Sequence, residues 1–446
     1  MILAAGQGTR MRSSIPKVMH PLLGQPLIWY ALHAAYHATG SKPTLIVGYG
    51  AEQVRLYVQD SADFVIQEQQ LGTGHAIQQV ESLLRGNADF ILVITADMPL
   101  LTSETLHNLI QTHTTADPKK IPITMLTVIN EDSHGFGRIL RNENGDVVSI
   151  VEEAVATPEQ LAIQECNASA YCFSADWLWE ALERIPLSPK GEYYLTDIVS
   201  IAVEDHLAVR AMIIDDPIET IGVNTRVHLA EATDILRKRI NNNWMLSGVT
   251  IIDPKSTYIE PNVEIGQDTV IWPNTHLQGN TSIGKTCKIG PNTLLLGSKV
   301  GDRCEITTAV VEFAEIEDDV EIGPFAHLRK GAHLAKGVRM GNFGEIKNSY
   351  LGPETKMGHF SYIGDANIGA NVNIGAGTIT CNYDGERKYP TEIGEGAFIG
   401  SDTMLVAPVK LGDGAQTGAG SVVTKDVPEN TLAVGAPARA IRKLKK

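Results

Sequence analysis

The sequence predicts two structural parts: an α/β domain with a mostly parallel sheet, followed by a β-solenoid. Strand and helix patterns alternate through the first half of the chain. From about Ile265 to Val423, an aliphatic residue, often followed by Gly, recurs every six positions. An amphipathic pattern between these regions predicts a helix. We expect domains at residues 1–223 and 250–446, joined by a linker helix within 224–249.

Length and composition exclude several classes of protein. A chain of 446 residues exceeds one ordinary domain, and its net charge of −15 argues against nucleic acid or an anionic membrane as the main partner. Met1–Leu3 leads directly into a Gly-rich loop, which is unlike a signal peptide, and no apolar run approaches the ~20 residues of a membrane span. Five scattered cysteines without CxxC spacing favour reduced thiols and a cytoplasmic protein: Cys166, Cys172, Cys287, Cys304 and Cys381.

The first stretch reads as a short strand over Met1–Leu3, a Gly-rich loop over Ala4–Met11 and a helix beyond it. Small residues let the backbone approach an anion, so this pattern predicts a phosphate cradle. It matches neither the dinucleotide-binding fingerprint nor the P-loop. An ordinary turn is the alternative interpretation, but Arg10 and Lys17 supply the counter-charge that phosphates need.

The next elements predict a parallel sheet with both faces covered. Strands are expected at Thr44–Gly48, Phe64–Gln67 and Phe90–Thr95, with a helix opening near Gly74. Asp97 follows the uniformly apolar third strand, and ligands of such sheets bind beyond the carboxyl ends of the strands. A helix N-cap or turn residue is the alternative interpretation of Asp97.

The pattern then changes toward antiparallel strands, beginning near Gly135. The expected elements are strands at Val147–Glu152 and Asn167–Phe173, a helix after the segment Gly191–Asp197, a strand end at Ile221–Asn224 and a helix over Arg226–Trp244. That last helix carries Leu229, Ala232, Leu236 and Ile240 on one face.

A period of six fits neither an α-helix nor a coiled coil. It fits short strands joined by turns, with the aliphatic residue pointing inward and Gly in the turns. Three such strands make one coil, and coils stack at roughly 4.8 Å as a parallel ladder. One coil cannot bury its aliphatic face alone, so a long array is required.

The repeat resembles the hexapeptide-repeat acyltransferases, whose solenoid is a left-handed parallel β-helix. The ordinary crossover rule predicts the opposite hand, so the expected hand rests on the resemblance. The same resemblance implies a homotrimer with sites between neighbouring chains.

The first domain resembles the sugar-1-phosphate nucleotidyltransferases, a Rossmann-like fold, through Leu3–Met11, Pro16-Lys17, Gln70–Ala76 and Gly191–Asp197. With the hexapeptide repeats, the whole chain is similar to the bacterial bifunctional N-acetylglucosamine-1-phosphate uridylyltransferases/glucosamine-1-phosphate acetyltransferases. This resemblance implies two steps toward UDP-N-acetylglucosamine. The solenoid would acetylate glucosamine-1-phosphate with acetyl-CoA, and the first domain would transfer UMP from UTP to N-acetylglucosamine-1-phosphate, releasing pyrophosphate.

The resemblance also implies roles for residues of the first domain. Nucleotide contacts would come from Leu3, Ala4, Ala5, Gly6 and Gly8, with uracil read by Gln67, Gly72 and Thr73. Arg10 and Lys17 would clamp the phosphates, Gly137, Glu152 and Asn167 would hold the sugar, and Asp97 and Asn224 would ligate Mg²⁺, which prefers such oxygen donors. Family members usually have Gly where this chain has Ala96, and Thr-Gly at Ala168-Ser169. We expect these changes to alter packing in the sugar pocket without loss of function.

In the solenoid, the resemblance makes His359 the general base for acetyl transfer, a task that suits imidazole at neutral pH. Arg329, Lys347 and Lys388 would hold the sugar phosphate, Tyr362 and Asn373 the sugar, and Ala376, Asn382, Tyr383, Ser401 and Ala419 acetyl-CoA. A surface turn residue is the alternative interpretation of His359. A zinc site at His327 and His333 is a weaker one, because no third His occupies a matching repeat.

The C-terminal tail departs from the family pattern. Family members often place Arg near Ala436, and we expect Arg439 to replace it as a coenzyme A contact, with Lys445 and Lys446 in a solvated tail. Two other hypotheses are a single-activity nucleotidyltransferase, whose solenoid only oligomerises or binds an effector, and a non-enzymatic scaffold. The set His359, Tyr362, Asn373 and Asn382–Asp384 favours the bifunctional enzyme, because a structural solenoid has no use for it.

Overall fold

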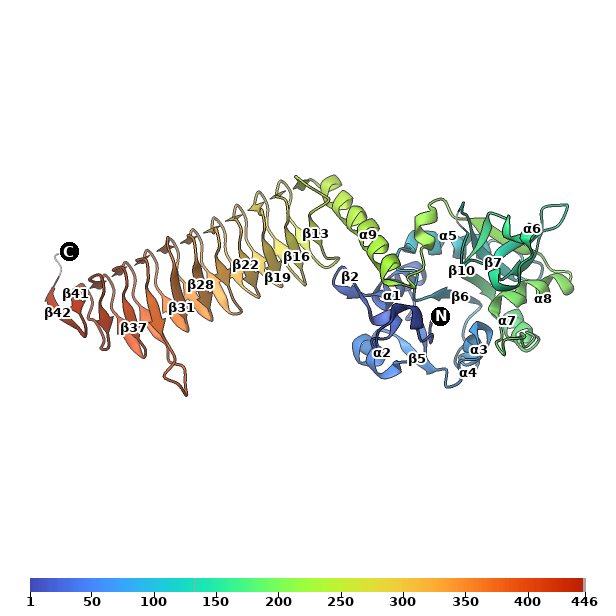
Figure 1. Cartoon of the computed structure of the whole chain (residues 1–446), viewed down its shortest axis with the longest axis horizontal. Coiled ribbons are helices and arrows are strands. Elements are labelled where there is room, and N and C mark those ends of the chain that lie inside the picture. Colours follow the sequence, from blue (N-terminus) through green and yellow to red (C-terminus); the bar gives the residue numbers. More distant parts are fainter. Residues whose placement is uncertain (132, 444–446) are drawn as a thin grey trace. The chain divides into compact units, whose positions relative to one another are not determined.

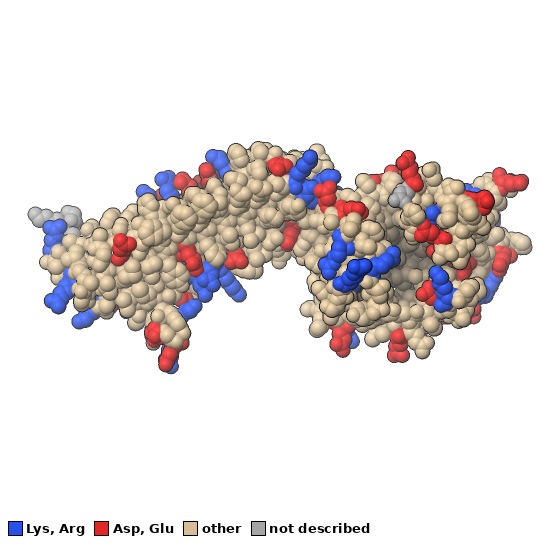
Figure 2. Space-filling model, viewed as in Figure 1, with Lys and Arg blue, Asp and Glu red and all other residues tan. Residues whose placement is uncertain are grey.

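The computed structural model describes residues 1–131 and 133–443 and divides into two compact units, Met1–Asp234 and Ile235–Lys446. The boundary falls inside helix α9 (Arg226–Leu246), which the sequence predicts over 226–244. Lys445 and Lys446 lie outside the described residues. Within the described ranges, no helix combines the length and apolar character needed to span a bilayer. Acidic and basic side chains are interspersed on the visible face of each unit (Figure 2).

Unit 1 is built on a nine-stranded sheet. Seven strands follow the order β11-β7-β10-β6-β1-β4-β5, and off this path β8 pairs with β10 and with β9. Parallel pairing joins β6, β1, β4 and β5 and also joins β7 to β11, whereas β10 is antiparallel to both of its neighbours in this order. The strands are β1 Ile2–Ala4, β4 Thr44–Val47, β5 Asp63–Ile66, β6 Phe90–Thr95, β7 Ile123–Ile129, β8 Arg138–Arg141, β9 Val147–Val151, β10 Glu165–Ser174 and β11 Val209–Ile213, with a separate hairpin of β2 Pro21–Leu22 and β3 Gln25–Pro26. The predicted α/β class with a mostly parallel sheet is confirmed.

Helices cover both faces of this sheet (Figure 1). One apolar core packs Ile28, Val54 and Leu106 from α1, α2 and α5 against the strands, and the other packs Leu178 and Ile198 from α7 and α8. The helices are α1 Leu27–Thr39, α2 Ala51–Val58, α3 Thr73–Gln78, α4 Glu81–Leu84, α5 Ser103–Thr114, α6 Pro158–Leu161, α7 Ala175–Leu182 and α8 Ile198–Glu204; the 3-10 turns are η1 Thr9–Met11, η2 Lys17–Met19, η3 Gln59–Ser61, η4 Glu153–Val155, η5 Leu195–Asp197 and η6 Pro217–Thr220.

Two local predictions are wrong. The Gly-rich loop leads into the short 3-10 turn η1 instead of an α-helix, because Gly8 and Arg12 on either side both take left-handed backbone conformations. The segment Ile221–Asn224 forms no strand; it is a connection after η6, and its backbone hydrogen bond to the segment after β6 runs from Val223 N to Asp97 O at 2.8 Å. The strand of this region is β11, whose pattern was not recognised.

Unit 2 is a stack of coils in which each side of the prism is a parallel sheet (Figure 1). The first sheet contains β12 Thr250–Ile251, β15 Val270–Ile271, β18 Lys288–Ile289, β21 Glu305–Ile306, β24 Glu321–Ile322, β27 Arg339–Met340, β30 Lys356–Met357, β33 Asn373–Ile374, β36 Phe398–Ile399, β39 Gln416–Thr417, β41 Thr431–Gly435 and the antiparallel β42 Ala438–Lys443.

The other two sheets follow the same rule. The second contains β13 Tyr258–Ile259, β16 His276–Gln278, β19 Leu294–Leu296, β22 Val310–Glu312, β25 His327–Leu328, β28 Gly344–Lys347, β31 Ser361–Gly364, β34 Ile379–Cys381, β37 Met404–Val406 and β40 Val422–Val423. The third contains β14 Glu264–Ile265, β17 Ser282–Ile283, β20 Lys299–Val300, β23 Glu315–Ile316, β26 Ala332–Leu334, β29 Ser349–Leu351, β32 Ala366–Ile368, β35 Thr391–Ile393 and β38 Val409–Leu411. The predicted β-helix is confirmed.

The predicted aliphatic positions form the interior of the solenoid. Ile271, Leu277 and Leu295 are completely buried, and the same core continues to Val423. Paired residues of most neighbouring coils lie 16 to 18 positions apart, but across the coil that contains the loop after β34 they lie 25 positions apart. Where two neighbouring aliphatic positions are fewer than six residues apart, the turn between them is shorter and the strands stay in register.

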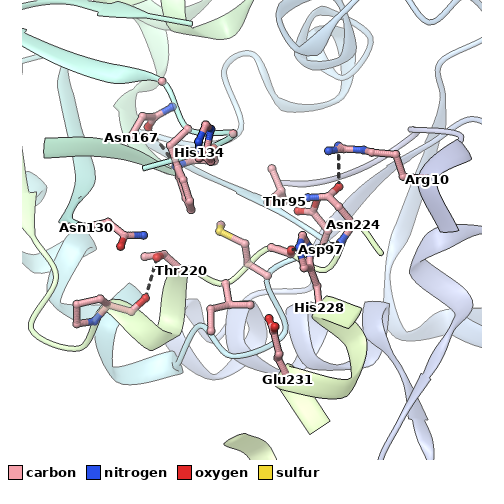
Figure 3. Close-up of a pocket in the computed structure, with 18 of the residues that line it drawn as sticks. Arg10, Thr95, Asp97, Asn130, His134, Asn167, Thr220, Asn224, His228 and Glu231 are labelled. Carbon is pink, nitrogen blue, oxygen red and sulfur yellow. Dashed lines mark hydrogen bonds between the residues drawn. The ribbon is translucent and has the colours of Figure 1, made fainter. Parts of the chain in front are cut away.

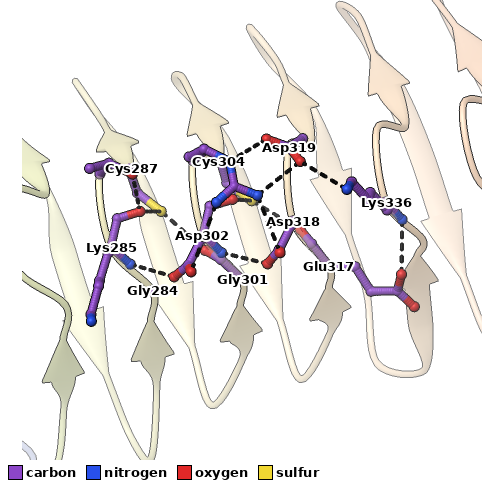
Figure 4. A network of polar contacts seen from close by, with 12 residues as sticks. Gly284, Lys285, Cys287, Gly301, Asp302, Cys304, Glu317, Asp318, Asp319 and Lys336 are labelled. Atoms are coloured by element: carbon purple, nitrogen blue, oxygen red, sulfur yellow. Dashed lines mark hydrogen bonds and ion pairs between the residues drawn. The ribbon is translucent and has the colours of Figure 1, made fainter.

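Polar side chains link successive coils at one corner (Figure 4). Asp302 Oδ1 accepts a hydrogen bond from Lys285 N at 2.7 Å, and Asp318 Oδ1 accepts one from Asp302 N at 2.8 Å. Inside the same corner, Cys287 and Cys304 donate to main-chain oxygens of the following coil at 3.1 and 3.0 Å. Each coil thus satisfies backbone groups of its neighbour as well as covering its apolar face.

The C-terminal half of α9 covers the open end of the first coil. Ile240, Trp244 and Met245 pack against the solenoid core. Asn241, which is completely buried, donates through Nδ2 to Pro254 O and Thr257 O, both at 3.0 Å. This helix supplies the cap that a solenoid needs at its end.

Leu328→Ala should destabilise unit 2 by about 2–5 kcal/mol, because it leaves a cavity in a fully packed coil. Leu246→Ala on α9 is the control, since Leu246 is 88% exposed and such changes cost at most about 0.5 kcal/mol. Calorimetric unfolding of the full chain measures both. Equal midpoints for the two variants would contradict the assignment of Leu328 to the core.

Candidate functional sites

Two cavities adjoin at the carboxyl ends of β1 and β6. The first, of about 460 Å³, is bordered by the Gly-rich loop. The second, of about 480 Å³, is bordered by the 134–137 and 220–224 segments (Figure 3). Thr95, Asp97 and Glu152 line both. The predicted residues Leu3, Ala4, Ala5, Gly6, Lys17, Gln67, Gly72 and Thr73 line the first cavity, and Arg10, Gly137, Glu152, Asn167 and Asn224 line the second.

Gly8 shapes the loop without lining either cavity. Its φ is 65°, and an added Cβ would lie 2.5 Å from Cβ of Lys17. Only Gly allows this approach, since other residues resist the left-handed conformation and the side chain would displace Lys17. The absence of a side chain at Gly8 therefore permits the close approach of Lys17 to the loop.

The motifs 70–76 and 191–197 form one wall of the first cavity. Tyr193 N donates to Leu71 O at 2.7 Å, Gly74 N donates to Tyr193 O at 2.8 Å, and Leu195 N donates to the Thr73 hydroxyl at 2.9 Å. Gly72, with φ 98°, leaves no room for a Cβ, because one would lie 2.6 Å from Tyr193 O. These close backbone contacts explain why the two motifs occur together.

Four polar side chains meet where the cavities adjoin. Lys17 Nζ lies 2.6 Å from Asp97 Oδ2 and donates to Asn224 Oδ1 at 3.0 Å. Arg10 donates to the same Asn224 oxygen at 3.1 Å (Figure 3). Burial raises the pKa of Asp97, but the charge and hydrogen bond of Lys17 outweigh it, so the pKa is lowered overall. Asp97 is therefore a carboxylate at neutral pH.

These contacts fit a divalent cation. A carboxylate oxygen of Asp97 and an amide oxygen of Asn224 converge on one positively charged atom, the Nζ of Lys17. Both are hard oxygen donors of the type that Mg²⁺ selects, with remaining positions left for phosphate and water. The pair could hold such an ion if Lys17 turned toward a bound phosphate.

The second cavity is lined partly by hydrogen-bonding side chains whose contacts the structure fixes. Glu152 accepts a hydrogen bond from the Thr196 hydroxyl at 3.0 Å, and Asn167 donates to the Tyr171 hydroxyl at 2.7 Å. Burial, followed by the charge of Glu152, raises the pKa of Asp197. Gly137 is required here, because an added Cβ would lie 2.8 Å from the Ile150 side chain.

The departures from the family pattern have a structural consequence. Ala96 and Ala168 are buried, so their methyl groups fill core space behind the cavity. Ser169 lines the cavity with φ 52°, the conformation that favours the Gly usual at this position. Its N–H donates to Asn167 Oδ1 at 3.1 Å, a local bond that holds this turn.

Several lining residues were not predicted as site residues. Glu192 and Tyr194 border the first cavity, and the 191–197 motif by itself predicts no role for either. Asn130, Thr220, His228 and Glu231 border the second cavity and carry no local pattern that distinguishes them from other loop and helix residues.

On the solenoid, three predicted cations gather at the second sheet. Tyr362 and Glu345 pair in adjacent strands, and Arg329 donates to Glu345 at 2.9 Å. The neighbouring Lys388 and then Arg329 lower the pKa of Lys347. This crowding of like charge is typical of a site that binds an anion.

His359 lies in the turn between β30 and β31 and is exposed. Ala376, Ser401 and Ala419 occupy the equivalent turns of later coils, joined by backbone hydrogen bonds from Asp402 N to Ala376 O at 2.6 Å and from Gly420 N to Ser401 O at 2.8 Å. The structure therefore aligns these predicted residues in one column along a corner. Asn373 is on the first sheet and is not part of the cation cluster.

The 380–390 segment leaves the coil as a protruding loop (Figure 1). Asn382 is buried and donates to Asp365 at the base of the loop, whereas Tyr383 is 60% exposed. Arg439 is exposed on β42 and pairs with Val434, so it belongs to a hairpin.

The zinc alternative receives no support from the two histidines that suggested it. His327 contacts Glu312 at 3.1 Å on the second sheet, and His333 contacts Glu317 at 2.9 Å on the third. The two imidazoles therefore lie on different faces of the solenoid. Across residues 1–131 and 133–443, no group of three His, Cys, Asp or Glu side chains is placed to hold a metal ion.

Comparisons with known proteins cover both units. Residues 1–134 match the MobA-like NTP transferase domain, and 262–297 and 390–425 match the bacterial transferase hexapeptide repeats. The chain is 46% identical to the bifunctional protein GlmU of Exiguobacterium sibiricum, over 97% of this chain and 96% of that protein. It is 44% identical to the bifunctional protein GlmU of Bacillus subtilis, over 99% of this chain and 96% of that protein.

Proposed function

The chain belongs to the family of bifunctional GlmU proteins, and from this premise we propose how its residues divide the work. The protein is a bifunctional transferase of UDP-N-acetylglucosamine synthesis. Unit 2 acetylates glucosamine-1-phosphate with acetyl-CoA. Unit 1 then transfers UMP from UTP to N-acetylglucosamine-1-phosphate and releases pyrophosphate. The observation that carries the second activity is the meeting of Lys17, Asp97 and Asn224 where two ligand-sized cavities adjoin.

In uridylyl transfer, UTP occupies the cavity of the Gly-rich loop and the sugar phosphate occupies the adjoining cavity. A phosphate oxygen of the sugar attacks the α-phosphorus of UTP, a new P–O bond forms, and the α–β bridging bond breaks. Arg10 and Lys17 neutralise charge on the phosphates, and Glu152 and Asn167 orient the sugar. Asp97 and Asn224 would hold Mg²⁺, which supplies charge neutralisation and in-line orientation when bound.

In acetyl transfer, His359 accepts a proton from the amine of glucosamine-1-phosphate. The amine nitrogen forms a bond to the thioester carbon of acetyl-CoA, the C–S bond breaks, and the coenzyme A sulfur leaves as the thiolate, which takes up a proton. Arg329, Lys347 and Lys388 hold the sugar phosphate, and Tyr362 and Asn373 hold the sugar. Ala376, Asn382, Tyr383, Ser401 and Ala419 contact acetyl-CoA.

We propose that the protein is a homotrimer in the cytoplasm. Phe325 and Phe343 stack with ring centroids 5.2 Å apart at the corner that carries His359, and these rings are 57% and 61% exposed. Such an apolar patch favours coverage by another copy of the chain. All five cysteines are free thiols, which supports a reducing compartment.

One assay tests the two activities together. The full chain is incubated with glucosamine-1-phosphate, acetyl-CoA, UTP and Mg²⁺, and the products are identified by mass. UDP-N-acetylglucosamine, coenzyme A and pyrophosphate are expected. Formation of UDP-N-acetylglucosamine only when N-acetylglucosamine-1-phosphate is supplied would support the single-activity alternative.

Arg439→Ala should raise KM for acetyl-CoA with little change in kcat or in uridylyl transfer. The guanidinium is expected to bond a coenzyme A phosphate, and a charge-assisted bond of roughly 1.5–3 kcal/mol corresponds to about a ten- to hundredfold change, less where solvent screens it. Arg442→Ala in the same strand is the matched control. Equal KM values for the wild type and Arg439→Ala would assign Arg439 to a solvated surface.

A further inference from the structure

The first turn of α9 borders the second cavity and contacts the segment that carries Asn224 (Figure 3). Thr225 precedes the helix, and its hydroxyl accepts a hydrogen bond from His228 N at 3.2 Å. In return, the His228 Nδ1 atom lies 3.4 Å from Asn224 N and 3.1 Å from Gly222 O. The Thr225–His228 bond is the first half of a capping box, but the side chain of His228 reaches back to Asn224 N, one residue before the cap, where Glu or Gln would normally reach the cap residue itself.

The Nδ1 atom of His228 holds the 222–224 segment in either tautomer. With a hydrogen it donates to Gly222 O, and without one it accepts from Asn224 N. The segment is anchored on its other side by the bond from Val223 N to Asp97 O at 2.8 Å. Both contacts, from His228 and from Asp97, are to the backbone of this segment. Together they fix the backbone position from which the Asn224 side chain extends.

The position of Asn224 determines the geometry at the junction of the cavities. Its Oδ1 atom accepts from Arg10 at 3.1 Å and from Lys17 at 3.0 Å, and Lys17 in turn contacts Asp97. A displacement of the 222–224 backbone would therefore separate the two oxygen donors that converge on the cation position. Outer groups that orient a ligand in this way commonly change metal affinity by about 10–100-fold when removed.

We propose that His228 is a positioning residue for uridylyl transfer, which sets the Asn224 oxygen for a divalent cation through the backbone of residues 222–224. The inference rests on the proposed role of Asn224 as a cation ligand. In this proposal His228 influences uridylyl transfer from helix α9. Its side chain contacts the protein backbone, whereas a substrate-binding residue would contact the sugar.

The experiment compares the full-length wild type with His228→Ala, His228→Gln and Glu231→Ala. Glutamine keeps a side chain that can accept a hydrogen bond or donate one at this position, whereas alanine removes it. Glu231 lines the same cavity from the next turn of α9, so its replacement is the matched control. Circular dichroism and thermal unfolding confirm that each variant is folded.

Three readouts are measured: hydrogen exchange of the Asn224 amide without metal, Mn²⁺ affinity by electron paramagnetic resonance with UTP present, and steady-state kinetics. His228→Ala should accelerate Asn224 exchange by up to about tenfold, as expected for one lost hydrogen bond. It should weaken Mn²⁺ binding by about tenfold or more and lower kcat for uridylyl transfer. KM for N-acetylglucosamine-1-phosphate and acetyl transfer should stay within twofold, and His228→Gln should recover most of the Mn²⁺ affinity.

Wild-type Mn²⁺ affinity in His228→Ala would overturn the proposal. Equal losses of Mn²⁺ affinity in His228→Ala and Glu231→Ala would also overturn it, because His228 would then act only as a residue that lines the cavity. Failure of His228→Gln to recover affinity would also overturn it. Asn224→Ala separates the two hypotheses. If that variant keeps wild-type Mn²⁺ affinity, the proposed ligand role of Asn224 fails, whatever the His228 variants show.

Discussion

Asp97→Asn should reduce kcat for uridylyl transfer by at least about a hundredfold, as expected when a preorganised electrostatic group is lost from a reaction site. Asp97 lies in both cavities and contacts Lys17 at 2.6 Å. Its lowered pKa keeps it ionised at neutral pH, so the substitution removes a full negative charge. The remaining amide oxygens would hold a divalent cation weakly, and an amide N–H₂ group would face the ammonium of Lys17. Pyrophosphate release measures the effect.

Acetyl transfer is the internal control for Asp97→Asn, since its residues lie in the other unit. It should be unchanged in the variant and should also survive EDTA, whereas EDTA should abolish uridylyl transfer. An acetyltransferase activity lost with EDTA would contradict the assignment of a metal to unit 1 alone and would support a metal site in the solenoid. Full uridylyl transfer by Asp97→Asn would place the cation ligands elsewhere.

His359→Ala should lower kcat for acetyl transfer by about 10²–10⁴-fold, the range for loss of a general base. His359 is exposed at the corner column shared with Ala376, Ser401 and Ala419, where the amine of the sugar and the thioester would meet. Coenzyme A thiol release measures the reaction, and uridylyl transfer from N-acetylglucosamine-1-phosphate should remain near the wild-type rate.

The control for His359 is another solenoid histidine. His333→Ala removes an imidazole that contacts Glu317 on a different sheet, so both activities should persist. Wild-type acetyl transfer in His359→Ala would show that this residue is an ordinary surface turn residue and not the general base. Parallel loss of both activities in a folded His359→Ala protein would contradict two independent sites.

Periodicity was the strongest local signal in the chain. Residues such as Ile322 and Ile399 could be assigned to the interior because each is followed by Gly in a repeat of its own. Val311 is also fully buried but was not recognised, because the period slips between Ile306 and Ile316. The short β11 was not predicted, although the turn signal Asp215-Asp216-Pro217 follows it in the sequence. The apolar residues of 221–224 resemble a strand, although only Val223 makes a sheet-like bond.

The candidate sites depend on contacts that no local pattern contains. Lys17 meets Asp97 from 80 positions away and Asn224 from 207 positions away, so their convergence follows from the order of strands in the sheet. Asp97 could be predicted from the sequence, because it is a carboxylate shortly after a strand of the parallel sheet. Asn224 came from family resemblance, and His228 could not be found at all, because its function depends on a helix start whose neighbour in space is the Asp97 loop.

The carboxylate contacts between coils restrict how the solenoid can change in length. Asp302 and Asp318 each accept a hydrogen bond from the backbone of the preceding coil. Most of the strands pair at intervals of 16 to 18 residues, or 25 where the loop after β34 adds residues to a turn. An insertion of a few residues within a strand would shift one coil out of step with its partners on three faces. Insertion or deletion of one whole coil would keep every repeat in register and move the far end by about 4.8 Å. The solenoid can therefore be lengthened or shortened only in steps of one coil. Chimeras that exchange complete coils are the variants most compatible with folding.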